Sequence, residues 1–228
     1  MKHQLKWMAW ETTRRCNLKC VHCRSSSECE VLGHPDFSTE EGFRIIDNIV
    51  EFASPVLVLS GGEPLLRADI FELAEYGASK DLTMALATNG SLVTDEICEK
   101  IKNSSISIVS LSIDGATAQT HDDFRSQKGA FEATINAAIG LASPGDIISI
   151  ATGDYVNDTD TVYVDKDLTF QFRNVSGLAD SVEIQSLFVE GDDTLTISNS
   201  AGLFLELERL WLGDTDIGTA DDKAHLIA

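Results

Sequence analysis

The first 142 residues of this 228-residue chain predict an α/β fold with a parallel sheet, and the rest predicts a β-rich segment. Three observations support this. Strand-like and helix-like patterns alternate through residues 1–142. One predicted strand, Pro55–Ser60 (PVLVLS), is a continuous apolar run, as expected of a strand buried on both faces. A polar or glycine-rich turn follows each predicted strand, where parallel sheets place their ligand sites.

The first two elements are a strand and a capped helix. The apolar opening Trp7–Thr13 (WMAWETT) predicts a short strand, and a loop follows it. Ser38 or Thr39 is then suited to cap a helix that runs to Ala53, with acidic residues in its first turn. Its apolar residues recur at helical spacing, at Phe43, Ile46, Ile49 and Val50.

The alternation continues beyond the Pro55–Ser60 strand. The predicted elements are a helix at Asp69–Lys80, a strand at Leu82–Thr88, a capped helix at Thr94–Asn103, a strand at Ile106–Asp114 and a helix at Gly129–Ala142. This pattern gives about four βα units in a row, which predicts a parallel sheet with helices outside it. Functional residues are then expected at the carboxyl ends of the strands.

The pattern changes after residue 142. Residues 146–152 (DIISIAT) are suited to be a fifth strand, but no helix pattern follows them. Short segments of alternating apolar and polar residues come next, separated by turn residues, at 161–172, 181–191, 193–199 and 203–213. We therefore predict two domains, 1–142 and 143–228. The second, rich in Asp and Thr, resembles the rungs of pectin-lyase-like β-solenoid proteins.

Composition narrows the classes of function. The formal net charge is −20, which makes a nucleic-acid backbone a poor partner. No run of 18 apolar residues suggests a membrane span, and the first residues lack the apolar core of a secretory signal. Three of the five cysteines are clustered, which favours metal binding over a disulfide framework. We expect a cytoplasmic protein.

The cysteine cluster comprises Cys16, Cys20 and Cys23, just after the first strand. One loop can therefore direct three thiolates at one centre. A structural zinc ion needs a fourth ligand, for which Cys29 and His22 are candidates. A [4Fe–4S] cluster held by three thiolates instead leaves one iron open to a substrate or cofactor. The spacing alone leaves both possibilities open.

Further motifs connect the chain to a known family. GGEP (Gly61–Pro64) follows the second strand, ATNG (residues 87–90) the third and SIDG (residues 112–115) the fourth. Together with the cysteine spacing, these motifs resemble the radical S-adenosylmethionine (SAM) superfamily. The sequences around these motifs, AWETTRRCNLKCVHCRSSSE and PVLVLSGGEPLLRADIFELAEYG, resemble the alternative heme-biosynthesis branch of this superfamily, which includes heme b synthase. The resemblance covers residues 1–142 and implies a partial radical SAM barrel.

The resemblance also implies roles for residues. Cys16, Cys20 and Cys23 would hold three irons, and SAM would chelate the fourth and be cleaved to a 5′-deoxyadenosyl radical. The implied SAM-binding residues are His22, Gly61, Gly62, Glu63, Pro64, Asn89, Ser112, Asp114 and Arg125. No catalytic side chain is identified. The implied partners are a small-molecule substrate, with a modified tetrapyrrole preferred to a peptide, and an electron donor such as ferredoxin or flavodoxin.

Two other interpretations remain. The chain is alternatively a β-solenoid surface or binding protein fused to a non-functional radical SAM fragment, in which case residues 143–228 carry the function. A third interpretation is a binding module that a structural zinc ion stabilises, in which case the clustered cysteines hold one zinc ion in place of the [4Fe–4S] cluster.

Overall fold

The structure is a computed structural model that describes residues 5–27, 35–115 and 118–144, together with the backbone of the strands between 147 and 227. The chain divides into two compact units. The first comprises Met1–Ile113 with Phe124–Gln127, and the second comprises Asp114–Asp123 with Lys128–Ala228.

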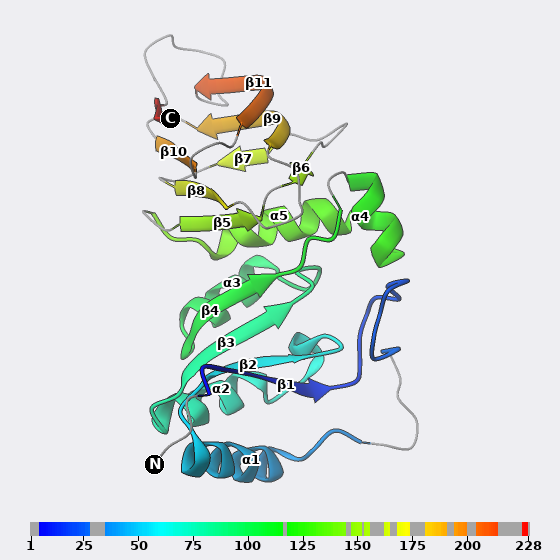
Figure 1. Cartoon of the computed structure of the whole chain (residues 1–228), viewed down its shortest axis with the longest axis vertical. Helices are drawn as coiled ribbons and strands as arrows, with labels where there is room; N and C mark the ends of the chain where they lie inside the picture. Colours follow the sequence, from blue (N-terminus) through cyan, green and yellow to red (C-terminus); the bar gives the residue numbers. More distant parts are fainter. Residues whose placement is uncertain are drawn as a thin grey trace. The chain divides into compact units, whose positions relative to one another are not determined.

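The first unit is built on a four-stranded sheet (Figure 1). Its strands are β1 (Trp7–Thr13), β2 (Val56–Gly61), β3 (Thr83–Thr88) and β4 (Ile106–Leu111). They lie in the order β1-β2-β3-β4, and every neighbouring pair is parallel. The predicted parallel α/β sheet is therefore confirmed, and the carboxyl ends of all four strands lie along one edge.

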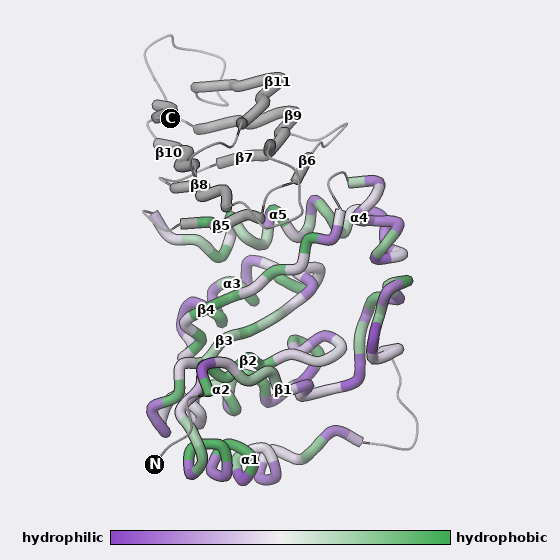
Figure 2. Tube along the Cα trace, viewed as in Figure 1, coloured by the Kyte–Doolittle hydropathy of each residue, from purple (hydrophilic) through white to green (hydrophobic). Residues whose placement is uncertain are grey.

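Helices connect these strands, as the alternation predicts. They are α1 (Thr39–Phe52), the 3₁₀ helix η1 (Pro64–Leu66), α2 (Ile70–Ser79) and α3 (Asp95–Lys102). Figure 2 shows hydrophobic and hydrophilic residues alternating along α1, as expected of a helix with one buried face. In the described part of the chain, no helix is both long enough and apolar enough to cross a membrane.

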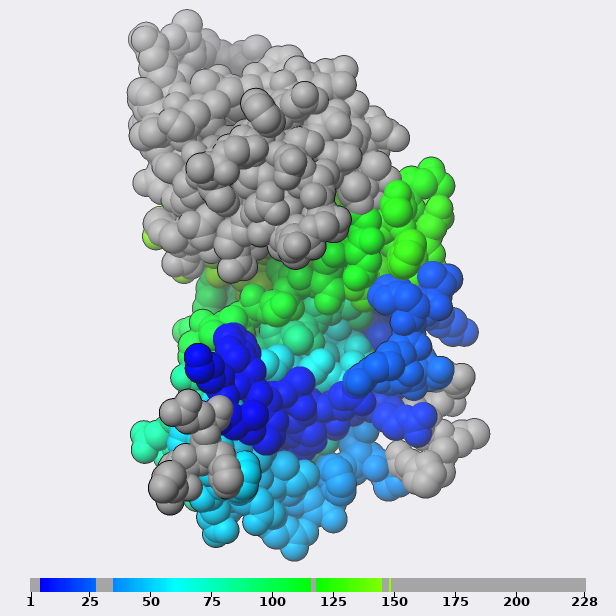
Figure 3. All heavy atoms as spheres, in the orientation of Figure 1, coloured from blue at the N-terminus to red at the C-terminus, as the bar shows by residue number. Residues whose placement is uncertain are grey.

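The core lies between the central strands and their helices. Leu57 and Leu59 of β2 and Met84 and Leu86 of β3 are fully buried. Ile46, Leu73 and other apolar helix residues complete this core. At the edge of the sheet, β1 is more exposed: Trp7 is 56% exposed, and the blue atoms of this segment lie on the surface seen in Figure 3.

The second unit contains most of α4 (Ala118–Arg125) and the helix α5 (Ala130–Leu141), and its described residues also form eight strands. The strands are β5 (Ile147–Ala151), β6 (Gly153–Tyr155), β7 (Val162–Val164), β8 (Leu168–Arg173), β9 (Ser181–Glu190), β10 (Thr194–Asn199), β11 (Phe204–Gly213) and β12 (His225–Ile227). These strands lie within residues 143–228, the segment predicted to be β-rich.

All pairings among these eight strands are parallel. One sheet has the order β12-β10-β8-β5, and the other has the order β11-β9-β6, with β7 also paired to β9. The segment expected as a fifth strand of the first sheet does form β5. It pairs with β8, however, and not with β4.

The start of α1 is fixed by a complete capping box. The N–H of Glu41 donates to Ser38 Oγ at 3.2 Å, and the N–H of Ser38 donates to the Glu41 carboxylate at 2.8 Å. Of the two residues predicted as the cap, Ser38 fills the position. This arrangement satisfies two N–H groups that the helix itself leaves without partners.

We predict that Ser38→Ala lowers the free energy of unfolding by about 1 kcal/mol, because it breaks the capping box. The matched control is Thr94→Ala, since Thr94 caps α3 with one longer hydrogen bond of 3.4 Å to Ile97 N. Urea unfolding of both variants measures the two costs. A larger loss for Thr94→Ala would show that the capping box contributes nothing beyond the single hydrogen bond.

Candidate functional site

The segment Arg14–Ser27, here called the cysteine loop, leaves the carboxyl end of β1 and carries the three clustered cysteines. Cys16 is buried, at 7% exposed, whereas Cys20 and Cys23 are partly exposed. The N–H of Cys23 donates to the carbonyl of Cys20 at 3.1 Å, which forms a tight turn between these two residues. All three thiols are free.

Each thiol has a hydrogen-bond donor of its own. The N–H of Leu18 donates to Cys16 Sγ at 3.4 Å, and the N–H of Ser27 donates to Cys23 Sγ at 3.4 Å. Arg125 Nη1 lies 3.7 Å from Cys20 Sγ. Hydrogen bonds of this kind stabilise the thiolate form, which is the form that ligates iron.

The pKa values of two thiols reflect this setting. Burial raises the pKa of Cys16, the N–H of Leu18 opposes that shift, and negative charge on Glu63, Cys20 and Cys23 raises the pKa further. The N–H of Ser27 outweighs burial and lowers the pKa of Cys23. Negative charge on Cys20 and Cys23 therefore contributes to the raised pKa of Cys16. A bound metal cation would favour all three thiolates.

This donor set fits an iron–sulfur cluster. Three thiols on one loop, with N–H donors to sulfur, are the chemistry that such a cluster needs. Among residues 5–27, 35–115 and 118–144, no three His, Cys, Asp or Glu side chains converge as ligands of a single metal ion would. Cys29, a candidate fourth zinc ligand, lies outside the described residues. His22, the other candidate, is exposed and lies 5.3 Å from the Phe124 ring, centroid to centroid.

The GGEP turn after β2 packs directly against the start of the cysteine loop. The N–H of Gly62 donates to Thr13 O, and the N–H of Glu63 donates to Arg15 O, both at 2.8 Å. A Cβ at Gly61 would lie 2.3 Å from Thr13 O, and one at Gly62 would lie 2.2 Å from Arg15 O. The close approach that these glycines allow is therefore to the backbone that enters the cysteine loop.

Glu63 joins the GGEP turn after β2 to the ATNG turn after β3. Its carboxylate is fully buried and accepts hydrogen bonds from Leu65 N at 3.0 Å, Thr88 Oγ1 at 2.8 Å and Asn89 N at 2.9 Å. Burial raises the pKa of Glu63, and these donors oppose the shift. Glu63 thus links the end of β2 to the end of β3. Pro64, also buried, begins η1.

Asn89 connects the turn after β3 to the cysteine loop. Its Nδ2 donates to Asn17 Oδ1 at 3.1 Å and lies 4.0 Å from Cys16 Sγ. Its Oδ1 accepts from Ser91 Oγ at 2.6 Å, and Asn17 Nδ2 donates to Ser91 Oγ at 2.8 Å. Sequence reasoning missed Asn17 and Ser91. The available signal was their position, directly after Cys16 and two residues after Asn89.

Arg125 lies in the same group, although it is distant in sequence. It is 8% exposed, and besides Cys20 Sγ its guanidinium contacts the carbonyl of Ser112, with Nη2 at 3.4 Å. Ser112 thus contributes its backbone to this group. Asp114 belongs to the second unit, where its N–H donates to His121 Nδ1 at 3.1 Å.

The family comparison agrees with these motifs. The model of the "Radical SAM superfamily" matches residues 10–160. The match extends beyond residue 142 and overlaps the first part of the β-rich segment.

Curated relatives match the first part of the chain. An "AdoMet-dependent heme synthase" of Methanosarcina barkeri is 47% identical over 135 residues, which cover 59% of this chain and 38% of that protein. A "Fe-coproporphyrin III synthase" of the same organism is 44% identical over 128 residues, which cover 56% of this chain and 32% of that protein. The chain therefore spans well under half the length of either relative.

Among solved structures, Streptococcus suis SuiB bound to S-adenosylmethionine is similar in fold. The TM-score is 0.51 at 16% identity, and the match covers 76% of this chain and 42% of that chain. At this identity the likeness supports the fold alone.

We predict that Thr88→Val lowers the free energy of unfolding by about 1–3 kcal/mol at pH 7, since it removes a buried donor to the Glu63 carboxylate. The folded-state pKa of Glu63 should rise further, so the loss should narrow as the pH falls and Glu63 is protonated. Thr134→Val is the control, because that hydroxyl donates to a neutral carbonyl, Ala130 O. Urea unfolding between neutral and acid pH measures the loss of unfolding free energy in each variant. A loss for Thr88→Val that grows towards low pH would contradict the role of Thr88 as a donor to the charged Glu63 carboxylate.

We also predict that Gly61→Ala disrupts the fold of the first unit, whereas Gly129→Ala costs only about 1 kcal/mol. Both glycines have positive φ, at +138° and +81°. Only at Gly61 would the added Cβ also collide with backbone, while at Gly129 nothing lies within 4 Å. Circular dichroism and thermal unfolding of the two variants test this difference. Equal losses of stability in the two variants would mean that the positive φ alone, and not the collision of the Cβ, determines the cost at both positions.

Proposed function

Since the chain belongs to the radical SAM superfamily, we propose that Cys16, Cys20 and Cys23 hold three irons of a [4Fe–4S] cluster and that SAM binds beside it. One observation supports this most strongly. The three thiols lie on one loop, and the turns GGEP and ATNG, together with Arg125, contact that same loop. The cofactor pair supplies one-electron cleavage of SAM to a 5′-deoxyadenosyl radical.

The chain's own residues bind and orient these cofactors. Leu18 and Ser27 donate N–H groups to two of the ligating sulfurs, which stabilises the thiolates. Asn89 is held by Asn17 and Ser91 and so keeps a fixed orientation next to Cys16. These fixed polar groups reduce the reorganisation that cofactor binding would otherwise require.

We assign the remaining predicted residues to SAM. Arg125 is a buried cation beside Cys20 and is suited to the SAM carboxylate. Gly61, Gly62, Glu63 and Pro64 form the turn that offers backbone groups to the SAM amine. The others, His22, Asn89, Ser112 and Asp114, are assigned to the adenosyl part and the methionine carboxylate of SAM.

A tetrapyrrole is the substrate class that we propose. The support is the identity of 47% and 44% to an AdoMet-dependent heme synthase and an Fe-coproporphyrin III synthase. Both matches fall in the part of the chain that carries the cysteine loop and the following turns. They favour a modified tetrapyrrole over a peptide.

The electron would come from a small acidic redox protein, such as a ferredoxin or flavodoxin, in the cytoplasm. In a chain of net charge −20, the cysteine loop carries a local excess of cations, with Arg14, Lys19 and Arg24 exposed. Opposite charges favour docking of an acidic donor near the thiols. The same overall charge disfavours nucleic acid as a partner.

For residues 143–228 we propose a separate domain with stacked, rung-like strands. The parallel pairing of alternate strands, such as β8 with β10 and β9 with β11, supports this arrangement. Residues 1–142 would then form the cofactor-binding domain.

Anaerobic reconstitution with iron and sulfide tests the proposal. We expect about four irons per chain and, after dithionite reduction with SAM, production of 5′-deoxyadenosine. Cys20→Ala should abolish that production. Cys98→Ala is the matched control, because Cys98 lies in α3 and outside the cysteine loop, and it should retain both cluster and product.

Two results would contradict this function. Colourless protein that holds one tightly bound zinc ion would favour the zinc-stapled module. A protein that binds four irons but forms no 5′-deoxyadenosine would retain the cluster and refute the cleavage reaction.

A further inference from the structure

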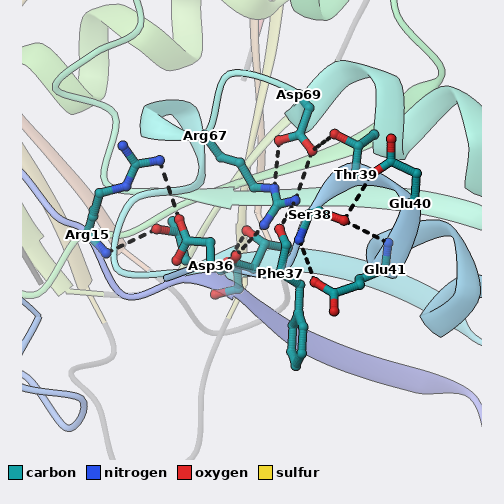
Figure 4. Close-up of polar contacts among 12 residues, drawn as sticks. Arg15, Asp36, Phe37, Ser38, Thr39, Glu40, Glu41, Arg67 and Asp69 are labelled. Carbon is teal, nitrogen blue, oxygen red and sulfur yellow. Dashed lines mark hydrogen bonds and ion pairs between the residues drawn. The ribbon is translucent and has the colours of Figure 1, made fainter. Parts of the chain in front are cut away.

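One buried guanidinium joins the two backbone segments that flank the cysteines. Arg67 follows η1 and is 4% exposed. Its Nη1 donates to Thr12 O at 2.9 Å, near the end of β1. Its Nη2 donates to Phe37 O at 2.8 Å, just before α1, and Figure 4 shows Arg67 beside Phe37 and Asp69. Thr12 precedes the cysteine loop and Phe37 follows it, so one side chain fixes the backbone on both sides.

Asp69 completes and neutralises this arrangement. Its Oδ2 accepts a hydrogen bond from Arg67 Nη2 at 2.8 Å, and its Oδ1 lies 2.7 Å from Arg67 Nε as an ion pair. Thr39 Oγ1 also donates to Asp69 Oδ2, at 2.7 Å. Burial alone would raise the pKa of Asp69, but hydrogen bonds from Arg67 and Thr39 outweigh it and lower that pKa. The carboxylate therefore stays charged beside the buried cation.

A second, weaker tie spans the same gap. Arg15, in the cysteine loop, lies 3.3 Å from Asp36, in the segment before α1 (Figure 4). Its side chain is 43% exposed, so solvent screens this pair. Arg67 is buried and makes its bonds to backbone carbonyls, and we expect it to contribute most of the constraint.

We infer that Arg67 is a positioning residue for the cysteine loop. Fixing the backbone at Thr12 and Phe37 limits the conformations open to the chain between them. The three thiols are thereby kept at the carboxyl edge of the sheet. Arg67 touches none of the thiols and acts through the backbone. An effect of Arg67 on cluster binding rests on the proposed function, whereas the effect of Arg67 on the conformation of the cysteine loop does not.

The geometry requires arginine in particular. Its planar group presents donors to three acceptors in different directions, namely Thr12 O, Phe37 O and the Asp69 carboxylate. A lysine ammonium is a single point charge and cannot reach all of them at once. Arg67→Lys should therefore restore part of what Arg67→Met loses.

The first test uses metal-free protein. Trypsin cuts after Lys19 and Arg24, which are exposed in the cysteine loop, and after Lys100 in α3, which serves as an internal reference. We expect Arg67→Met to speed cleavage at Lys19 and Arg24 about tenfold, as the loss of one or two buried hydrogen bonds implies. Cleavage at Lys100 should not change. Arg67→Lys should fall between Arg67→Met and the parent chain.

The control variant is Arg44→Met, since Arg44 is an exposed arginine of α1 whose ion pair to Glu41, at 3.8 Å, is long. Cleavage of this variant at Lys19, Arg24 and Lys100 should match that of the parent chain. Unchanged cleavage in the cysteine loop of Arg67→Met would overturn the inference, and so would equal acceleration at Lys100, which would indicate general destabilisation. If Arg67→Met does not fold, Arg67→Lys decides by the same criteria.

The second test uses reconstituted protein and measures the rate at which a chelator removes iron. We expect removal about tenfold faster from Arg67→Met and unchanged from Arg44→Met. A parent chain that binds no iron would refute the proposed function. The trypsin comparison on metal-free protein would still test whether Arg67 constrains the cysteine loop. Iron removal at the parent rate from a variant whose loop is readily cleaved would refute the link between Arg67 and the cluster.

Discussion

The site depends on the backbone contact between two neighbouring strand ends. The turn after β2 meets the start of the cysteine loop through Gly62 N–H to Thr13 O and Glu63 N–H to Arg15 O, both at 2.8 Å. Parallel pairing of β1 and β2 brings these ends to the same edge, and the absence of a Cβ at Gly61 and Gly62 lets them touch. The position of Cys16 follows directly from this contact, since it is the next residue along the chain.

Buried polar groups extend that contact in two directions. Glu63 ties the turn after β2 to the turn after β3, where Asn89 lies beside Cys16. Arg67 ties the same region to the segment before α1. The Glu63 carboxylate accepts three hydrogen bonds, and the Arg67 guanidinium donates to two backbone carbonyls and to Asp69. Such networks hold a loop in one arrangement where apolar packing would not. The protein thus positions its cysteines mainly through bonds to backbone.

Local patterns predicted the elements, but they did not predict which elements meet. PVLVLS predicted a strand, although in the structure only Leu57 and Leu59 of β2 are fully buried. The polar residues before the helix predicted a cap at Ser38 or Thr39, and Ser38 fills that position. Both signals are local. The glycines of GGEP were interpreted as SAM-binding residues, whereas the structure shows that they approach the backbone of Thr13 and Arg15, a contact that strand pairing creates. Nothing in the sequence indicated the role of Arg67, because two of its partners are backbone carbonyls, which every residue carries. Residues 146–152 were predicted as a fifth strand after the four βα units, and they form β5, but the local sequence cannot select β8 as its neighbour.

The central claim is that the cysteine loop holds a cluster to which SAM binds. Electron paramagnetic resonance of the reconstituted, dithionite-reduced chain, recorded before and after SAM is added, tests it most directly. The account predicts a reduced [4Fe–4S] signal whose g values shift on addition of SAM, as an iron with an open position would require. A cluster signal that SAM leaves unchanged, or no cluster signal in protein that retains zinc, would contradict it.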